Sequence, residues 1–268
     1  MGDWLFKPQV SVANPAYRRP LSPKQIRLLE IIFKFRFVSV PSLASLLGKD
    51  RSSVYQNLYV LAEQGYLAKR YNKTYRLRGR PASYFLAAKG LRYLRDNSEL
   101  NQAVLHNMYK SPGISEEHVD HCLLTIAVYH ALHRQTNATF GVYSRYELAE
   151  YEFCPRPLPD LYLSRKQPEA NRQSDYMLDI FEPQLPFWVM KQRIRAYQQQ
   201  CDEADLPDYP HILLVAPNQR TEKKLLEIIE NLVDDFELYT TTLERMLGAG
   251  DKSPSVWRAA FEEQISSL

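Results

Sequence analysis

Residues 50–67 read DRSSVYQNLYVLAEQGYL, and this stretch contains the start, the body and the end of one amphipathic helix. Asp50 belongs to the residue types that cap helix starts, and Gly65 is typical of the position after a helix end. Three apolar residues share one face at helical spacing, which predicts that they are buried: Val54, Leu58 and Leu61. We therefore predict a helix from about 50 to 64 with one face in a core.

A second face of the same helix is polar. It carries Ser52, Tyr55, Gln56 and Tyr59, with Arg51 at its start. A helix that reads DNA places hydrogen-bonding side chains near its amino terminus against base edges in the major groove. The chemistry of this face fits such a recognition helix, and an ordinary exposed helix surface is the alternative.

Two further helices are predicted upstream. Ser22-Pro23-Lys24-Gln25 supplies an N-cap, a proline at the first helical position and a glutamine at the third, which together make a capping box. This pattern favours a helix over 23–36. A shorter helix begins at Pro41 and ends at Gly48. Three short helices joined by tight turns are typical of a helix-turn-helix unit.

Short β-prone runs follow at 67–71, 74–77 and 83–86. Basic residues are concentrated in and between these runs, with Tyr71 and Tyr75 interleaved: Lys69, Arg70, Lys73, Arg76, Arg78 and Arg80. A β-wing of this composition can lie along a groove of DNA and neutralise phosphates. We expect these cations to hold the backbone, while Arg51, Tyr55 and Gln56 read bases.

Short phrases of this region resemble those of bacterial winged-helix regulators. They are Gly65-Tyr66-Leu67, Tyr84-Phe85-Leu86 and Lys89-Gly90-Leu91. A fourth helix over about 87–95 is expected to pack back on the core. The first part of the chain is therefore predicted to be a winged helix-turn-helix that binds double-stranded DNA.

The charge of the chain changes sign along its length. Residues 1–110 hold 19 Lys and Arg against 6 Asp and Glu, a net charge of +13. Residues 111–268 hold 15 against 25, a net charge of −10. Such asymmetry indicates that one half meets a polyanion and the other does not. We accordingly expect the acidic half to meet a protein partner or a second copy of the chain.

The composition shift defines the predicted domains. The chain divides into an arm over 1–20, the winged helix over 21–95, a linker over 96–115 and a second domain over 116–268. Helices are predicted in this second domain over 116–134, 186–203 and 221–235, and strands over 140–146, 159–164, 174–181, 211–216 and 236–241. Strands that alternate with helices predict a mixed sheet, so the fold class is α/β, or α+β over the whole chain.

The order of these elements resembles the PD-(D/E)XK nuclease superfamily. Pro159-Asp160 at a strand start and Asp179 in the next strand match the two metal-binding acids of that family. The resemblance implies that Asp160 and Asp179 hold Mg²⁺, which orients water and stabilises phosphoryl charge. Phe181 stands where the family has a lysine, so Lys191 on the following helix is the candidate for a displaced catalytic lysine.

The missing lysine supports a second interpretation, in which the nuclease site is degenerate and Asp160 and Asp179 are ordinary acids of the fold. The chain would then need no cofactor. His118 and His121 lie one helical turn apart, but no ligand motif accompanies them. We expect a satisfied or exposed histidine pair there and not a metal site.

A winged helix followed by such a core resembles the replication-relaxation protein family of bacterial plasmids, integrated elements and phages. The resemblance covers about residues 21–258 and rests on the order of short phrases, among them Leu178-Asp179-Ile180 followed by Lys191 and Tyr197. It implies a DNA-binding protein of a mobile element that acts in replication or the relaxation complex. A Mg²⁺-dependent endonuclease or nickase is the first alternative, and a transcriptional regulator whose acidic domain senses a ligand is the second.

Composition narrows the remaining classes. The chain has no apolar run long enough for a membrane span, and its first residues lack an apolar stretch, so we expect no secretory signal. Its three cysteines, Cys122, Cys154 and Cys201, are widely separated, which is typical of reduced thiols in a cytoplasmic protein. No GxSxG phrase and no glycine-rich phosphate loop is present. We therefore expect neither a serine hydrolase nor a protein with a bound organic cofactor.

Overall fold

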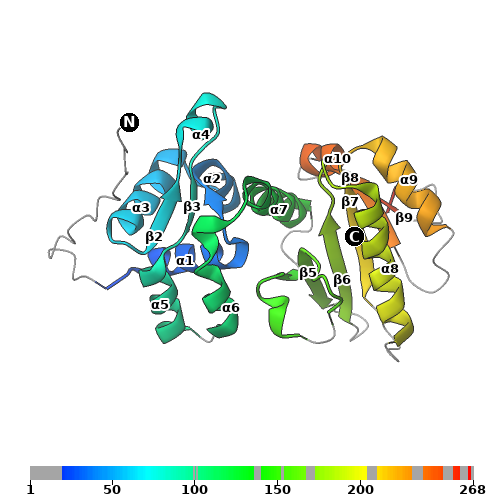
Figure 1. Ribbon diagram of the computed structural model, residues 1–268, viewed down its shortest axis with the longest axis horizontal. Helices are drawn as coiled ribbons and strands as arrows, with labels where there is room; N and C mark the ends of the chain where they lie inside the picture. Colours follow the sequence, from blue (N-terminus) through cyan, green and yellow to red (C-terminus); the bar gives the residue numbers. More distant parts are fainter. Residues whose placement is uncertain are drawn as a thin grey trace, which may run out of the picture.

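The computed structural model describes residues 20–98, 100, 102–135, 140–151, 154–166, 173–203, 210–230, 238–249, 256–259 and 265–266. The predicted arm therefore lies outside the described residues, apart from Pro20. The described parts form an α/β structure with two sheets, a small antiparallel one and a larger mixed one. Figure 1 shows the small sheet and its helices at left and the large sheet at right.

The amino-terminal part is built on a three-stranded antiparallel sheet with the order β1-β3-β2. Its strands are β1 (Val38–Ser39), β2 (Leu67–Arg70) and β3 (Ser83–Leu86). The surrounding helices are α1 (Pro23–Phe35), α2 (Val40–Leu47), α3 (Arg51–Glu63), α4 (Lys73–Leu77) and α5 (Ala88–Asn97). The predicted order of helices is confirmed, and β1 is an element that the sequence interpretation did not include.

The helix ends follow from local hydrogen bonds. The Ser22 hydroxyl accepts from the Gln25 backbone N–H, and the Gln25 side chain accepts from the Ser22 N–H at 2.9 Å, so the predicted capping box is formed. Asp50 caps α3 by accepting from the Ser53 N–H at 2.7 Å. Gly48 ends α2 with φ of 59°, a left-handed conformation that glycine adopts without strain. These caps separate α1, α2 and α3.

The run over 74–77 is a helix, and its prediction as a strand was wrong. The Asn72 side chain accepts from the Tyr75 N–H at 3.0 Å, which starts a helical turn at Lys73. The ring of Tyr75 is buried, so this short helix is fixed to the core. The segment over 67–86, which we call the wing segment, is therefore β2-α4-β3, and α4 projects from it at the top of Figure 1.

Gly90 in the predicted phrase Lys89-Gly90-Leu91 is explained by a close approach. A Cβ atom at Gly90 would lie 2.2 Å from the Tyr66 carbonyl oxygen, so α5 can cross this backbone only with glycine there. The Lys89 ammonium lies over the Tyr66 ring at 4.2 Å and donates to the Gln64 carbonyl. Together these contacts fix α5 against the turn after α3.

The larger sheet has seven strands among the described residues, in the order β10-β9-β8-β7-β6-β5-β4. Strands β6, β7 and β8 are parallel, and the other neighbours are antiparallel, which confirms the mixed sheet. The strands are β4 (Phe140–Ser144), β5 (Leu161–Lys166), β6 (Gln173–Ile180), β7 (His211–Ala216), β8 (Leu238–Thr242), β9 (Trp257–Ala259) and β10 (Ile265–Ser266).

Helices cover both faces of this sheet. On one face lie α7 (Glu116–Gln135) and α10 (Leu243–Gly248), and on the other lie α8 (Phe187–Glu203) and α9 (Gln219–Ile229). The short elements α10, β9 and β10 were not predicted, because their runs are too short for periodicity to reveal. The last residues of the predicted helix over 221–235 lie outside the described residues.

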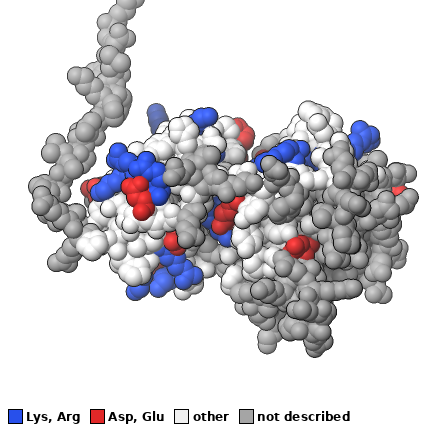
Figure 2. All heavy atoms as spheres, turned by 90° about the horizontal axis from the view of Figure 1, so that it is seen from below, with Lys and Arg blue, Asp and Glu red and all other residues white. Residues whose placement is uncertain are grey.

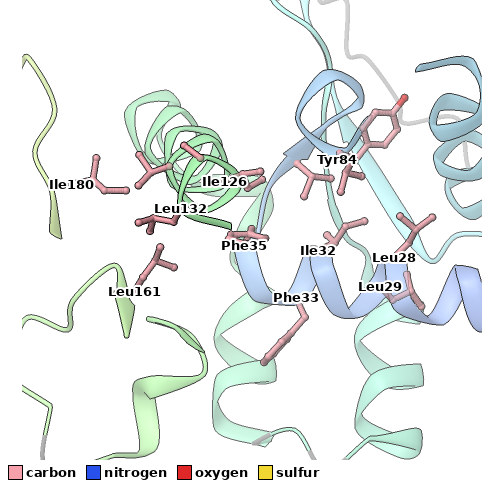
Figure 3. Close-up of a cluster of buried hydrophobic side chains, with 14 of the residues drawn as sticks. Leu28, Leu29, Ile32, Phe33, Phe35, Tyr84, Ile126, Leu132, Leu161 and Ile180 are labelled. Carbon is pink, nitrogen blue, oxygen red and sulfur yellow. The ribbon is translucent and has the colours of Figure 1, made fainter. Parts of the chain in front are cut away.

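Helix α7 joins the two parts of the molecule. Its residues Ile126 and Leu132 belong to one buried cluster with Phe35 of α1 and with Leu161 and Ile180 of the large sheet. Figure 3 shows these five side chains in one apolar layer, with α7 between α1 and the sheet. One core therefore runs through both predicted domains.

The described part of the predicted linker over 96–115 contains a packed helix. It contains α6 (Gln102–Met108), whose Val104, Leu105 and Met108 are buried in the same cluster. The Arg36 guanidinium donates to the Asn107 carbonyl and the Ser111 hydroxyl. The charge reversal occurs here, as the sequence indicates, but the apolar residues of α6 hold this stretch against the first part.

Candidate functional site

The polar face of α3 is exposed as predicted. All five of its candidate residues are exposed: Arg51, Ser52, Tyr55, Gln56 and Tyr59. The rings of Tyr55 and Tyr59 are stacked, with centroids 6.1 Å apart and an interplanar angle of 27°. On the opposite face, Val54, Leu58 and Leu61 are buried against the core. Helix α3 thus presents a hydrogen-bonding and aromatic surface on a fixed support.

The six predicted wing cations fall into two groups. Four are exposed and can reach a ligand: Lys69, Lys73, Arg76 and Arg78. Three of these lie on or directly after α4, at the projecting end of the wing segment. Leu77, between Arg76 and Arg78, is 77% exposed, so this end is not covered by any other described part of the chain.

Arg70 and Arg80 are engaged inside the molecule. Arg70 Nη2 lies 2.6 Å from Glu116 Oε1, and Arg80 pairs with both Glu116 and Asp120. The Arg80 guanidinium also lies 4.9 Å from the centroid of the Tyr75 ring. These ion pairs fasten the wing segment to the first turns of α7, so both guanidinium groups already have partners within the chain.

Positive charge is not confined to the wing segment. Figure 2 shows the molecule from below, a face on which Lys and Arg side chains form several groups over the amino-terminal part, at left. The carboxyl-terminal part, at right, shows both blue and red patches. Basic residues of the first half therefore form more than one group on this face.

The structure brings Asp160 and Asp179 together, as the sequence predicts. The register pairs Leu161 of β5 with Leu178 of β6, which places Asp160 beside Asp179. The Ile180 N–H donates to Asp160 Oδ2 at 2.9 Å. Asp160 is 3% exposed and Asp179 is 0% exposed, so both carboxyl groups are inside the molecule at the carboxyl end of β6.

Asp160 is surrounded by cationic side chains. His121 Nε2 lies 2.7 Å and Arg145 Nη2 lies 3.1 Å from Asp160 Oδ1. Burial alone would raise the pKa of the Asp160 carboxyl, but Arg145 and His121 outweigh it and hold that pKa well below its usual range. Asp160 is therefore a carboxylate whose charge is neutralised from within the chain.

Asp179 has its own partners on α8. Arg193 Nη1 contacts Asp179 Oδ1, and the Tyr197 hydroxyl donates to Asp179 Oδ2 at 2.8 Å. Burial raises the pKa of Asp179, and the Arg193 guanidinium opposes that rise. Arg193 and Arg145 also share the Leu158 carbonyl oxygen, so the two acids and the two arginines form one network.

His121 connects this network to a third acid. Its Nδ1 lies 2.8 Å from Glu182 Oε1, while Nε2 faces Asp160. Because ionised carboxylates only accept hydrogen bonds, both ring nitrogens donate and the ring is an imidazolium. Burial disfavours this charge, but Asp160 and Glu182 outweigh burial and raise the pKa of His121 to about 9. The predicted histidine pair is thus divided, because His121 belongs to this network of acids and arginines.

His118 lies in different surroundings, one turn earlier on α7. Its Nε2 is 3.0 Å from the Tyr146 hydroxyl. Burial, with Arg36 and Arg145 nearby, lowers the pKa of His118 to about 4. The ring is therefore neutral at pH 7, and the two histidines carry different charges although they are adjacent on one helix.

The position expected for Lys191 is taken by Arg193. No hydrogen bond or ion pair joins Lys191 to another described residue, and Arg193, two residues later, contacts Asp179. The oxygens of Asp160 and Asp179 accept from Arg145, His121, Arg193 and Tyr197. Carboxylates satisfied in this way do not fit Mg²⁺, which needs oxygen ligands in octahedral geometry. Within the described residues, no group of three acids, histidines or cysteines is arranged to hold a metal ion.

A cavity of about 310 Å³ opens beside this network. It lies between the start of α7, the end of β6 and the inner face of α8. Its lining includes both histidines and both arginines of the network and the acids Glu117 and Glu182. We call the network and this cavity the acid centre: His118, His121, Arg145, Asp160, Asp179, Glu182, Arg193 and Tyr197.

Sequence reasoning missed the arginines of the acid centre, although helical spacing contains a signal for one of them. Met190, Ile194 and Tyr197 form the buried face of α8, and Arg193 lies on that face. Lys191 is about 200° around the helix from Arg193, and so it points elsewhere. Arg145 follows a strand end, where no periodicity exists to identify it.

These details describe a charged centre and an exposed basic surface in one molecule. The chain matches no family model, no curated protein and no solved structure. No helix among the described residues has the length and apolar character needed to cross a membrane. Cys122 and Cys154 are buried free thiols, and the side chain of Cys201 lies outside the described residues.

Proposed function

We propose that the protein binds double-stranded DNA through a winged helix formed by α1, α2, α3 and the wing segment. The observation that carries this proposal is the combination of an exposed polar face on α3 with four exposed cations in the wing segment. A helix of this kind enters the major groove, and a neighbouring basic segment contacts the backbone of the same duplex.

The α3 face has the chemistry for base contacts. Arg51 at its start can donate two hydrogen bonds to a guanine, and Gln56 can pair with an adenine edge. The stacked rings of Tyr55 and Tyr59 offer apolar surface for a thymine methyl group together with hydroxyl donors. Since the supporting residues of α3 are buried, these side chains are presented from a rigid element.

The wing segment has the chemistry for phosphate contacts. Its four exposed cations have no carboxylate partner among the described residues, in contrast to Arg70 and Arg80. Each contact between such a cation and a phosphate releases a counterion, so binding of this kind falls with salt concentration. Arg70 and Arg80 are instead paired with acids of α7.

For the second half, we propose a degenerate PD-(D/E)XK-like domain that serves as an interaction platform. Internal cations neutralise Asp160 and Asp179, which supports a structural role for these acids. The net charge of −10 over residues 111–268 also disfavours nucleic acid over most of that surface. Such a protein suits a cytoplasmic role in replication or its regulation on a mobile element, with a second copy or another protein on the acidic half.

Electrophoretic mobility measured over a range of salt concentrations tests the DNA proposal. The variant Lys73→Ala/Arg76→Ala/Arg78→Ala should bind duplex DNA at least about tenfold more weakly. The slope of log K against log salt should flatten by about 0.9 for each lost phosphate contact. A matched control, Lys24→Ala/Arg92→Ala/Arg95→Ala, removes the same charge from α1 and α5 and should change the slope little. Unchanged binding by the first variant, or equal losses in both, would contradict the proposal.

Supercoiled plasmid tests the platform proposal. Incubated with the protein and Mg²⁺ or Mn²⁺, the plasmid should stay supercoiled, because the carboxylates of the acid centre are satisfied by cations. Nicking that disappears in Asp160→Ala and in Asp179→Ala would instead establish the endonuclease alternative. A promoter footprint and reporter assay separate replication from transcriptional regulation.

A further inference from the structure

A second cavity, separate from the acid centre, lies near the carboxyl ends of the parallel strands β7 and β8. It has a volume of about 500 Å³. Residues of α9, α10 and β9 line it: Gln219, Glu222, Lys223, Leu226, Arg245 and Arg258. None of these residues belongs to the acid centre or to the proposed DNA surface, so the cavity is an independent feature of the fold.

The cavity is positively charged although it lies in the acidic half. Three of its lining residues are cations, Lys223, Arg245 and Arg258, and one is an acid, Glu222. Glu222 is 2% exposed, and both of its oxygens have partners: Thr240 donates to Oε1 and Arg245 contacts Oε2. Glu222 is thus fully paired and holds Arg245 in place. The lining as a whole keeps a net charge of +2.

Arg245 has hydrogen-bonding capacity left over. Its Nη2 contacts Glu222, but its Nη1 is a buried atom without a hydrogen-bond partner among the described residues. A buried guanidinium N–H without an acceptor is destabilising, so such groups normally have a hydrogen-bond partner. An oxygen of a ligand in the cavity would supply that acceptor. Lys223 and Arg258 are exposed, so they can turn toward the same ligand.

The position in the fold favours an anion. The cavity lies at the carboxyl ends of the parallel strands β7 and β8, where open α/β sheets bind their ligands. Helix α9 begins here after its cap Asn218, so its positive dipole end faces this edge. Both α9 and α10 start at this edge, as the upper right of Figure 1 shows.

We propose that this cavity binds a phosphate monoester. Such a group carries a charge of about −1.5 to −2 at pH 7, which matches the net charge of the lining. A guanidinium held by Glu222 offers its remaining N–H groups in a planar array that fits phosphate oxygens. The volume accommodates a group of mononucleotide size. Two sources present this chemistry: a free mononucleotide and the 5′-phosphate at the end of a nucleic-acid strand.

Calorimetric titration of the full chain distinguishes the two sources. The probes are adenosine 5′-monophosphate, adenosine, and a ten-residue thymidine oligonucleotide with and without a 5′-phosphate. The proposal expects binding that depends on the phosphate monoester, in the nucleotide, in the oligonucleotide or in both. Preference for the free nucleotide identifies a metabolite site, and preference for the phosphorylated oligonucleotide identifies a strand-end site. If adenosine binds equally well, or if neither phosphorylated probe binds, the proposal is wrong.

Variants of exposed residues assign the binding to this cavity. Lys223→Glu/Arg258→Glu should weaken binding of the phosphorylated probe at least about tenfold, since each lost contact is a charge-assisted hydrogen bond. Lys224→Glu alters the neighbouring exposed lysine, which does not line the cavity, and should leave affinity within about twofold. Equal losses in both would overturn the assignment. Because the wing segment is intact in these variants, their duplex binding tests the DNA proposal separately.

Discussion

The wing segment and the acid centre use the same kind of side chain in opposite ways. Arg76 and Arg78 are exposed at the end of α4 and have no carboxylate partner among the described residues. Arg145 and Arg193 are partly shielded, with side chains 23% and 19% exposed, and each neutralises a buried aspartate. An arginine in the first setting can bind an external anion, whereas an arginine in the second completes the fold. The chemistry available to a ligand therefore depends on pairing, which net charge does not reveal.

Between these extremes are Arg70 and Arg80. They belong to the wing segment by sequence, but Glu116 and Asp120 of α7 hold them, as the interior acids hold Arg145 and Arg193. Their side chains are about as shielded as those of Arg145 and Arg193, but their acid partners Glu116 and Asp120 are 35% and 47% exposed and not buried. Three predictions test how far the contrast between external and internal cations extends, beginning with the largest effect.

The largest effect is expected from Arg193→Ala. This variant leaves Asp179 buried with only Tyr197 as a partner, and removal of one member of a buried ion pair costs about 3–5 kcal/mol. Urea unfolding at pH 7, followed by circular dichroism, measures this loss. Arg195→Ala removes an exposed arginine from the same helix and should lose less than about 0.5 kcal/mol.

The pH dependence of Arg193→Ala distinguishes a lost ion pair from lost packing. Without Arg193, burial should raise the pKa of Asp179 further, so the folded state takes up a proton at a higher pH than the unfolded state does. A carboxyl group whose pKa is raised in the folded state lowers stability at high pH, and this loss becomes smaller as the pH falls. The stability deficit should therefore shrink between pH 7 and pH 5. A deficit that stays constant over this range would assign Arg193 a packing role only.

His121 should give the next largest effect. Its pKa is raised from 6.5 to about 9, so its contribution is fully present below pH 6.5 and is lost as pH rises through 9. The free energy of unfolding should fall over this window by on the order of 3 kcal/mol. His121→Gln should remove that slope. His118→Gln should retain it, because a pKa lowered to about 4 contributes only between pH 6.5 and 4, where stability falls as pH falls.

The smallest effect concerns the cations between the two extremes, and it rests on the proposed DNA binding. Glu116→Gln/Asp120→Asn releases Arg70 and Arg80 from partly exposed ion pairs, which should cost at most about 1 kcal/mol. The freed arginines should raise duplex affinity severalfold and steepen its salt slope by about 0.9 for each new phosphate contact. Asp96→Asn/Glu117→Gln removes the same charge without touching either arginine. If both variants raise affinity equally, bulk charge and not release explains the gain.

Much of the fold could be predicted from local signals. Ser22, Gly48 and Asp50 are capping residues whose hydrogen bonds form within a few positions of themselves, so their effects are visible in the sequence. The strand prediction over 74–77 failed because a single Asn72 side-chain hydrogen bond outweighs β-propensity in so short a run. The packing of α6 could not be predicted, because it depends on where α1 and α7 lie.

The acid centre was predicted only in part, for a similar reason. The family resemblance selected Asp160 and Asp179, and the register of β5 and β6 brings them together. Their partners come from α7, α8 and the end of β4, which are separated along the chain and meet only after folding. The family pattern predicts a lysine beside the two acids. Two buried carboxylates need cationic partners, which can come from any neighbouring element. Here those partners are Arg145, His121 and Arg193.

The buried apolar cluster that α7 shares with both parts of the molecule has a consequence for how the chain unfolds. Helix α7 packs on α1 and α2 and on the large sheet. Unfolding of either half would therefore expose apolar surface of the other half that is buried in the folded protein. Heating should therefore produce a single calorimetric transition, with one enthalpy for the whole molecule. If the chain were divided between α6 and α7, each fragment would expose part of the shared hydrophobic core and would tend to aggregate. The net charge thus changes sign near residue 110, but the hydrophobic core continues across that position.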